Sequence, residues 1–143
     1  ATIAVMLWRL EGSPAASGDL AFSDVLENYW YTEGIRWAAS AGVITGYDGK
    51  FNPDADVTRE QLATMLFRYA QYKGMDVSIG EDTNILSYAD ALSVSDYAVS
   101  AMQWVCGAGI VNGMERDGDL VLAPGDASSR AVVATMLMRF GKQ

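Results

Sequence analysis

The chain has 143 residues, which is enough for one compact domain or a few small repeats but not for a multidomain enzyme. Of these residues, 50% are hydrophobic and 20% are charged, the balance of a folded globular chain rather than a disordered one. Ten basic and eighteen acidic residues give a net charge of −8. This excess of acid argues against a nucleic-acid partner, because phosphate binding draws on clustered Lys and Arg.

The residue types exclude several kinds of catalytic and metal site. The sequence contains no His, so a Ser-His-Asp triad, a Cys-His pair and a His-ligated zinc or haem are excluded. Cys106 is the single cysteine, which excludes an internal disulfide. Asp117 and Asp119 suggest a calcium loop, but the full ligand spacing is absent. We therefore expect no enzyme, no cofactor and no metal ion, and no apolar run is long enough for a membrane span.

One octapeptide pattern occurs three times along the chain. The segments Ile3–Leu10, Leu62–Tyr69 and Val133–Phe140 share the order apolar-Ala-x-Met-Leu-x-Arg-apolar. Their apolar residues recur at i, i+3, i+4 and i+7, which is one stripe of an amphipathic helix. On this spacing the methionines are core residues, and the repeated arginines are expected on the helix surface or in salt bridges. These side chains are Met6, Met65 and Met136, with Arg9, Arg68 and Arg139.

The repetition divides the chain into five parts. In order, these are the second helix of a truncated first repeat, a linker, a complete repeat, a second linker and a second complete repeat. We place them at residues 1–12, 13–21, 22–73, 74–87 and 88–143. The missing first half of the truncated repeat is expected to be omitted from this chain, removed by cleavage or supplied by another chain.

Each complete repeat is expected to consist of an aromatic-x-Asp turn, a helix, a glycine-bounded loop and a longer helix. The four helices are expected at about 31–41, 59–72, 95–108 and 130–142. Gly42 and Gly109 suit the left-handed position after the first helix of each repeat. Thr58 with Gln61 predicts a capping box at the start of the second helix, and Ser129 is the corresponding cap. The second loop is four residues longer than the first, and we expect little strand pairing in either.

Several motifs in order resemble the surface-layer homology repeat of bacterial cell-surface proteins. They are Phe22-Ser-Asp24-Val25, Trp30-Tyr31, Ile35 to Gly46, Gly49-x-Phe51-x-Pro53 and Val57-Thr58-Arg59-Glu60-Gln61. The resemblance implies an all-α fold of tandem helix-loop-helix repeats in a pseudo-threefold, three-pronged spindle, here with a truncated first repeat. It further implies a noncatalytic, extracellular anchor that binds secondary cell-wall polysaccharide, typically one carrying pyruvate ketals, in grooves between the prongs.

Arginines at two helix starts are the main candidates for binding such a glycan. Arg59 and Arg130 each present a planar guanidinium, which can take a carboxylate through two hydrogen bonds. Backbone N–H groups and the positive end of the helix dipole also favour an anion there. We expect one good groove at Arg59, a weaker one at Arg130 and none in the truncated repeat.

Further residues are candidates for contact with a sugar, and each has a structural alternative. Asp24 and Asp90 could accept sugar hydroxyls or could close turns. A sugar ring could stack on Trp30 or Tyr97, although a core position is the favoured interpretation for Trp30. Two glycines at matching positions could let a ligand approach the backbone closely; they are Gly46 and Gly113. Buried positions inside helices are expected for Trp37 and Trp104.

A second hypothesis is a protein-interaction or assembly module. The incomplete first repeat motivates it, because an open helical flank with an apolar edge invites a complementary half-repeat from another chain or a cleaved fragment.

Overall fold

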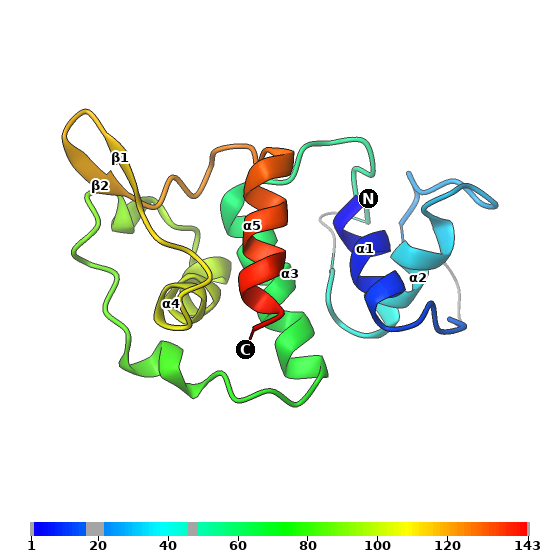
Figure 1. Ribbon diagram of the computed structural model, residues 1–143. Coiled ribbons are helices and arrows are strands. Elements are labelled where there is room, and N and C mark those ends of the chain that lie inside the picture. The colour runs from blue at the N-terminus through cyan, green and yellow to red at the C-terminus, as the bar shows by residue number, and fades with distance from the viewer. Residues whose placement is uncertain (1, 17–21, 46–48, 143) are drawn as a thin grey trace. The chain divides into compact units, whose positions relative to one another are not determined.

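The computed structural model describes residues 2–16, 22–45 and 49–142 (Figure 1). The chain divides into two compact units, Ala1–Ala55 and Asp56–Gln143.

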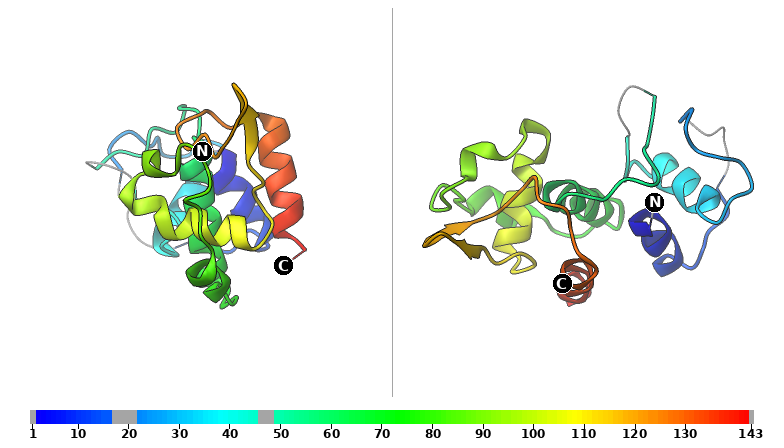
Figure 2. Two further views of the ribbon diagram at one scale, coloured as in Figure 1. Left: turned by 90° about the vertical axis from the view of Figure 1, so that its left-hand side faces the viewer. Right: turned by 90° about the horizontal axis from the view of Figure 1, so that it is seen from above.

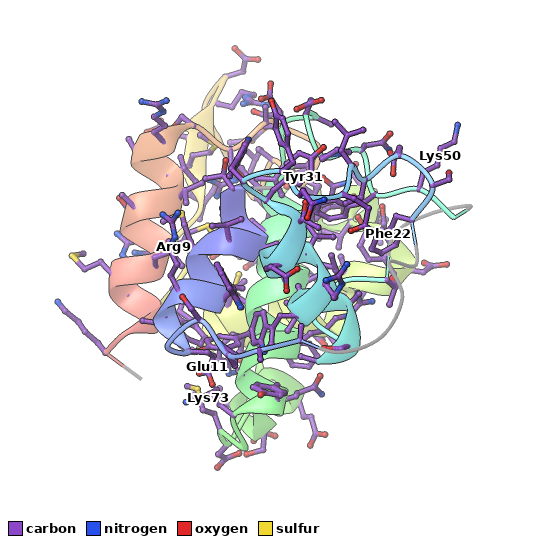
Figure 3. All side chains as sticks on the ribbon, turned by 90° about the vertical axis from the view of Figure 1, so that its right-hand side faces the viewer. Arg9, Glu11, Phe22, Tyr31, Lys50 and Lys73 are labelled. Atoms are coloured by element: carbon purple, nitrogen blue, oxygen red, sulfur yellow. The ribbon has the colours of Figure 1, made fainter. Side chains whose placement is uncertain are left out.

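The first unit is built around two packed helices. They are α1 (Thr2–Leu10) and α2 (Thr32–Ser40). The helices cross closely at Gly34, because a Cβ at this position would lie 2.9 Å from Cγ2 of Val5 and 3.0 Å from its Cα. Phe22 and Tyr31, both labelled in Figure 3, are buried in this unit with Ile3. A small residue on α2 therefore lets the apolar face of α1 approach it.

The second unit packs helices around an aromatic core. Its elements are α3 (Arg59–Tyr72), η1 (Ser78–Asp82), η2 (Ala91–Ser93), η3 (Asp96–Ala98), α4 (Val99–Gly107), β1 (Met114–Arg116), β2 (Asp119–Val121) and α5 (Arg130–Phe140). Phe140 of α5 lies between two buried rings, with centroids 5.6 Å from Tyr69 of α3 and 6.1 Å from Trp104 of α4. These contacts join the three α-helices through one core.

The compact units do not coincide with the predicted repeats, because the predicted repeat of residues 22–73 is divided between them. In the first unit, α1 ends one repeat and α2 begins the next. The second unit joins α3, the end of that predicted repeat, to the whole of the following one, from η2 to α5. The three-pronged spindle stays a prediction.

Local helix signals in the sequence are confirmed. The Thr58 hydroxyl accepts the N–H of Gln61, and the Gln61 side chain accepts the N–H of Thr58, which completes the capping box. Ser129 caps α5 in the corresponding way. Gly42 and Gly109 follow their helices with φ of 77° and 75°, as expected for a left-handed position.

The expectation of an all-α fold is only partly right, because the longer loop of the last repeat forms a hairpin. Strands β1 and β2 pair antiparallel and project from the helices of their unit (Figure 2). The turn between them is Asp117-Gly118, with φ of 52° and 84°. An Asp-Gly pair with positive φ at both residues is the favoured two-residue hairpin connection, so this pair was the sequence signal for the strand pairing.

The close crossing of α1 and α2 predicts an effect of side-chain size at Gly34. Gly34→Val should destabilise the protein by about 1–3 kcal/mol, because the new side chain meets the backbone of Val5. Gly125→Val is the control, since a Cβ at Gly125 has open space around it. Urea unfolding of both variants measures the difference, and equal stability of the two would contradict the crossing described.

Candidate functional site

The side chain of Arg59 is buried at the start of α3. It is 9% exposed, and its Nε–H donates to the carbonyl oxygen of Leu122 at 2.9 Å. In the described part of the chain, no ion pair joins Arg59 to a carboxylate. Burial lowers the pKa of Arg59, and the nearby charge of Asp126 opposes this shift. The guanidinium is treated as charged, because arginine stays protonated in proteins.

Backbone N–H groups at the start of α3 are already used by the protein. The N–H of Arg59 donates to the carbonyl of Asp126 at 2.9 Å, and the N–H of Glu60 donates to that of Pro124 at 3.0 Å. The next N–H, that of Gln61, donates to its cap Thr58. The expectation that free backbone N–H groups at this helix help to bind an anion is therefore wrong. Any contact of this helix start with an anion has to come from the side chain of Arg59.

Arg59 lines a pocket in the second unit. The pocket has a volume of about 210 Å³ and lies between α3, the segment after α4, and one face of α5. Its lining residues are Arg59, Ile110, Val111, Asn112, Ala131, Val132, Thr135, Met136 and Arg139. None of these described residues is acidic. The pocket thus joins two guanidinium groups, an amide and a hydroxyl to an apolar wall.

Arg139 is a site residue that the sequence analysis missed. One of its terminal nitrogens donates to the carbonyl of Ile110 at 3.2 Å, so the side chain is held along the pocket. The signal in the sequence was the Arg that recurs in all three octapeptides, interpreted as a surface or salt-bridging residue. Spacing along a helix cannot show that the segment after α4 would face this Arg.

The carboxylates of Asp24 and Asp90 close equivalent turns. Asp24 accepts the backbone N–H groups of residues 51–52 at 2.8 and 2.7 Å, which lowers its pKa. Asp90 accepts those of residues 122–123, both at 2.8 Å. Both oxygens of each carboxylate hold a loop in the same way, which favours the turn-closing alternative. The pair also confirms that the two repeats fold alike here.

Glu60 connects α3 to the following repeat. Its carboxylate oxygens accept the backbone N–H and the hydroxyl of Ser95, at 2.9 and 2.7 Å, just before η3. Glu60 is itself buried. The acid that follows Arg in the motif therefore has a structural role that the sequence analysis did not assign, and Ala131 stands at the equivalent position of α5.

The predicted aromatic residues divide between core and surface. Trp37 and Trp104 are buried, which confirms their expected core positions. Trp30 is 56% exposed and Tyr97 is 53% exposed. The core alternative for Trp30 is therefore wrong, and its ring is open to a ligand. The core position expected for Met6 is also wrong, because this side chain is 38% exposed.

The remaining predicted residues do not line the pocket. Arg130 is exposed at the start of α5. A Cβ at Gly113 would collide with the ring of Tyr88, so this glycine serves packing. Gly46 lies outside the described residues. Among the predicted residues that the structure describes, Arg59 is the one in the pocket.

Neither a metal centre nor a membrane span is found in the parts of the chain described. No group of three or more Cys, Asp or Glu side chains is placed to hold a metal ion there. In those same segments, every helix is too short or too polar to cross a bilayer.

Comparison with known proteins identifies a family and several relatives. Residues 21–63 match the S-layer homology domain. The chain is 35% identical over 97% of its length to an endoglucanase of Bacillus sp. (strain KSM-635), and it covers 15% of that protein. It is 26% identical over 87% of its length to the surface-layer 125 kDa protein of Lysinibacillus sphaericus, covering 10% of it. It is also 28% identical, over 50% of its length, to the cellulosome-anchoring protein of Acetivibrio thermocellus, and it covers 16% of that protein.

The carboxylate of Glu60 predicts a measurable contribution to stability. Glu60→Ala should lower the free energy of unfolding by about 1–3 kcal/mol, because it leaves the half-buried N–H and hydroxyl of Ser95 without their acceptor. Glu33→Ala is the control, since Glu33 forms an exposed ion pair with Arg36, and such a pair contributes at most about 1 kcal/mol. Unfolding in guanidinium chloride measures the free energy of unfolding of both variants. A larger loss for Glu33→Ala would contradict the role given to Glu60.

Proposed function

We propose that this chain is a noncatalytic module that attaches a bacterial protein to the cell wall, because residues 21–63 match the S-layer homology domain. The domain is characteristic of S-layer and cell-surface proteins, so the chain is assigned to the cell surface. The chain is similar to proteins named as a surface-layer protein, a cellulosome-anchoring protein and an endoglucanase. A module shared by proteins of such different names fits attachment better than a reaction.

The proposed ligand is an acidic secondary cell-wall polysaccharide that carries pyruvate ketals. A pyruvate ketal bears a carboxylate and a methyl group on the same carbon. The pocket offers the guanidinium groups of Arg59 and Arg139 to the carboxylate, and apolar side chains such as Val132 to the methyl group. This pairing of two cations with an apolar wall, without an acidic lining residue, is the observation that carries the proposal.

The size of the pocket suits one sugar substituent rather than a long stretch of glycan. Its volume of about 210 Å³ is below the roughly 300–1,000 Å³ of sites for drug-sized ligands. The rest of the polysaccharide would therefore lie on the surface. In the second unit, the exposed ring of Tyr97 is proposed to stack on its sugars, and Arg130 is proposed as a weaker contact for acidic groups. The exposed ring of Trp30 is proposed as a separate stacking surface of the first unit.

Long-range attraction has little part in this binding. The net charge of −8 repels an anionic polymer, so electrostatic steering does not draw it to the protein. Affinity has to come from short contacts in the pocket, where the guanidinium of Arg59 is shielded from solvent. In the same proposal, Asp24 and Asp90 position the loops and make no sugar contact, since their oxygens are engaged.

Removal of either pocket arginine should weaken binding. Arg59→Gln and Arg139→Gln are each expected to raise the Kd for the pyruvylated polysaccharide by about 10- to 150-fold, because a hydrogen bond to a charged group contributes about 1.5–3 kcal/mol. Arg9→Gln is the matched control, since Arg9 holds the same octapeptide position as Arg139 but lies on the surface of the other unit. Isothermal titration calorimetry with purified polymer measures the Kd of each of the three variants.

Polymer stripped of its pyruvate is the second arm of the same titration. It should bind the unchanged protein about as weakly as the pyruvylated polymer binds Arg59→Gln. Equal affinity for both polymers would refute the ketal as the ligand. Equal affinity of all three variants for the pyruvylated polymer would refute the pocket as the site.

A further inference from the structure

The segment that follows α4 contains an asparagine directly before a glycine. Asn112 lines the pocket together with Arg59 and is exposed to solvent, and Gly113 is the next residue. Because glycine has no Cβ, its backbone nitrogen can approach the side-chain amide of the preceding asparagine with little steric hindrance. An Asn-Gly pair is for this reason especially prone to lose that amide spontaneously.

The loss of the amide is a reaction of the chain with itself and with water. The backbone nitrogen of Gly113 gives its proton to solvent base and bonds to Cγ of Asn112, and the bond between Cγ and the side-chain nitrogen breaks. That nitrogen takes up a proton and leaves as ammonia, and a succinimide ring remains. Water then opens the ring and leaves aspartate or isoaspartate. One neutral amide becomes one negatively charged carboxylate.

The other three asparagines of the sequence are placed less favourably for this reaction. Asn52 precedes a proline, whose nitrogen carries no proton. The backbone N–H that follows Asn28 donates to the hydroxyl of Thr32 at 2.8 Å. The side-chain oxygen of Asn84 accepts the backbone N–H of Leu86 at 2.8 Å, and the residue between them is a bulky isoleucine. The sequence and these contacts therefore single out Asn112.

Tyr88 restrains the attacking nitrogen. A Cβ at Gly113 would collide with the ring of Tyr88 and would lie 2.9 Å from Cγ of Leu120, so the backbone there is tightly packed. Burial raises the pKa of Tyr88, and the contact of its phenol oxygen with the backbone N–H of Gly113 opposes this shift. The same hydroxyl contacts the thiol of Cys106. Ring closure therefore has to wait for a local opening of this packing.

We propose that Asn112 is a modification site, at which slow deamidation restrained by Tyr88 places a carboxylate in the pocket of Arg59 and Arg139. None of the described lining residues is acidic before the reaction. The new carboxylate pairs with the guanidinium groups and competes with any other anion for them. The pocket thus loses its capacity for an acidic ligand as the protein ages. The proposal does not rest on the identity of the glycan, because its tests use the protein alone.

Mass spectrometry of aged protein tests the site. The folded chain is kept at mildly alkaline pH and digested, and conversion of amide to acid is followed at each asparagine. Asn112 should convert faster than Asn28, Asn52 and Asn84, but more slowly than it does in the chain unfolded in guanidinium chloride. Conversion of Asn112 no faster than that of Asn84 in the folded chain would overturn the proposal. Equal rates at Asn112 in the folded and unfolded chains would also overturn it, since the packing would then provide no restraint.

Tyr88→Phe tests the restraint, because it keeps the packed ring and removes the phenol oxygen. The rate at Asn112 should rise about two- to tenfold, the factor that one hydrogen bond between neutral groups provides. Tyr29→Phe, in the first unit, is the matched control and should leave this rate unchanged. An unchanged rate in Tyr88→Phe would contradict the role of the tyrosine. So would an equal rise at Asn84, since the whole chain would then have loosened.

The charge added to the pocket is measured at Arg59. In Asn112→Asp and in deamidated protein isolated by anion exchange, the nitrogen–proton NMR signal of the Arg59 Nε–H should shift in the same direction. Asn112→Gln is the matched control, because it keeps a neutral amide, and its shift should be smaller. The signal of Arg9 should stay in place in all of these proteins. If the Arg59 signal does not move in Asn112→Asp, the new acid does not act on the pocket and the proposal fails.

Discussion

The start of α3 is held by the repeat that follows it, and both the fold of the second unit and its pocket depend on this attachment. The backbone of Arg59 donates to Asp126, its side chain donates to Leu122, and the neighbouring Glu60 binds Ser95. These bonds join residues 35 or more positions apart in the chain. They attach the end of one predicted repeat to the loops of the next within one packed unit.

The same attachment gives Arg59 its chemical character. Because Nε is bonded to a carbonyl and not to a carboxylate, the side chain is oriented but its charge is not neutralised by an ion pair within the described residues. Arg139 is oriented in the same manner by the carbonyl of Ile110. Carbonyl groups thus position two guanidinium groups around a pocket of mixed polar and apolar lining, which is the arrangement that a carboxylate with an apolar neighbour requires.

Features that depend on nearby residues could be predicted from the sequence, and features that depend on distant ones could not. The cap at Thr58 and the left-handed Gly109 were predictable because neighbouring residues determine them. The pairing of Glu60 with Ser95 could not be predicted, because the spacing of the repeats does not show which half-repeats pack together. The exposure of Trp30 was misjudged for a related reason, since an aromatic side chain carries no sign of the face on which it lies. The hairpin was predictable in principle from Asp117-Gly118.

The central claim is that Arg59 and Arg139 are charged groups held ready for an acidic sugar in one pocket. Nitrogen–proton NMR of the arginine side chains during titration with a pyruvylated wall-sugar fragment tests it most directly. The account predicts that the Nε–H resonances of Arg59 and Arg139 shift together and saturate at the same ligand concentration, while that of Arg9 stays in place. Shifts confined to surface arginines such as Arg9, with Arg59 unchanged, would contradict it.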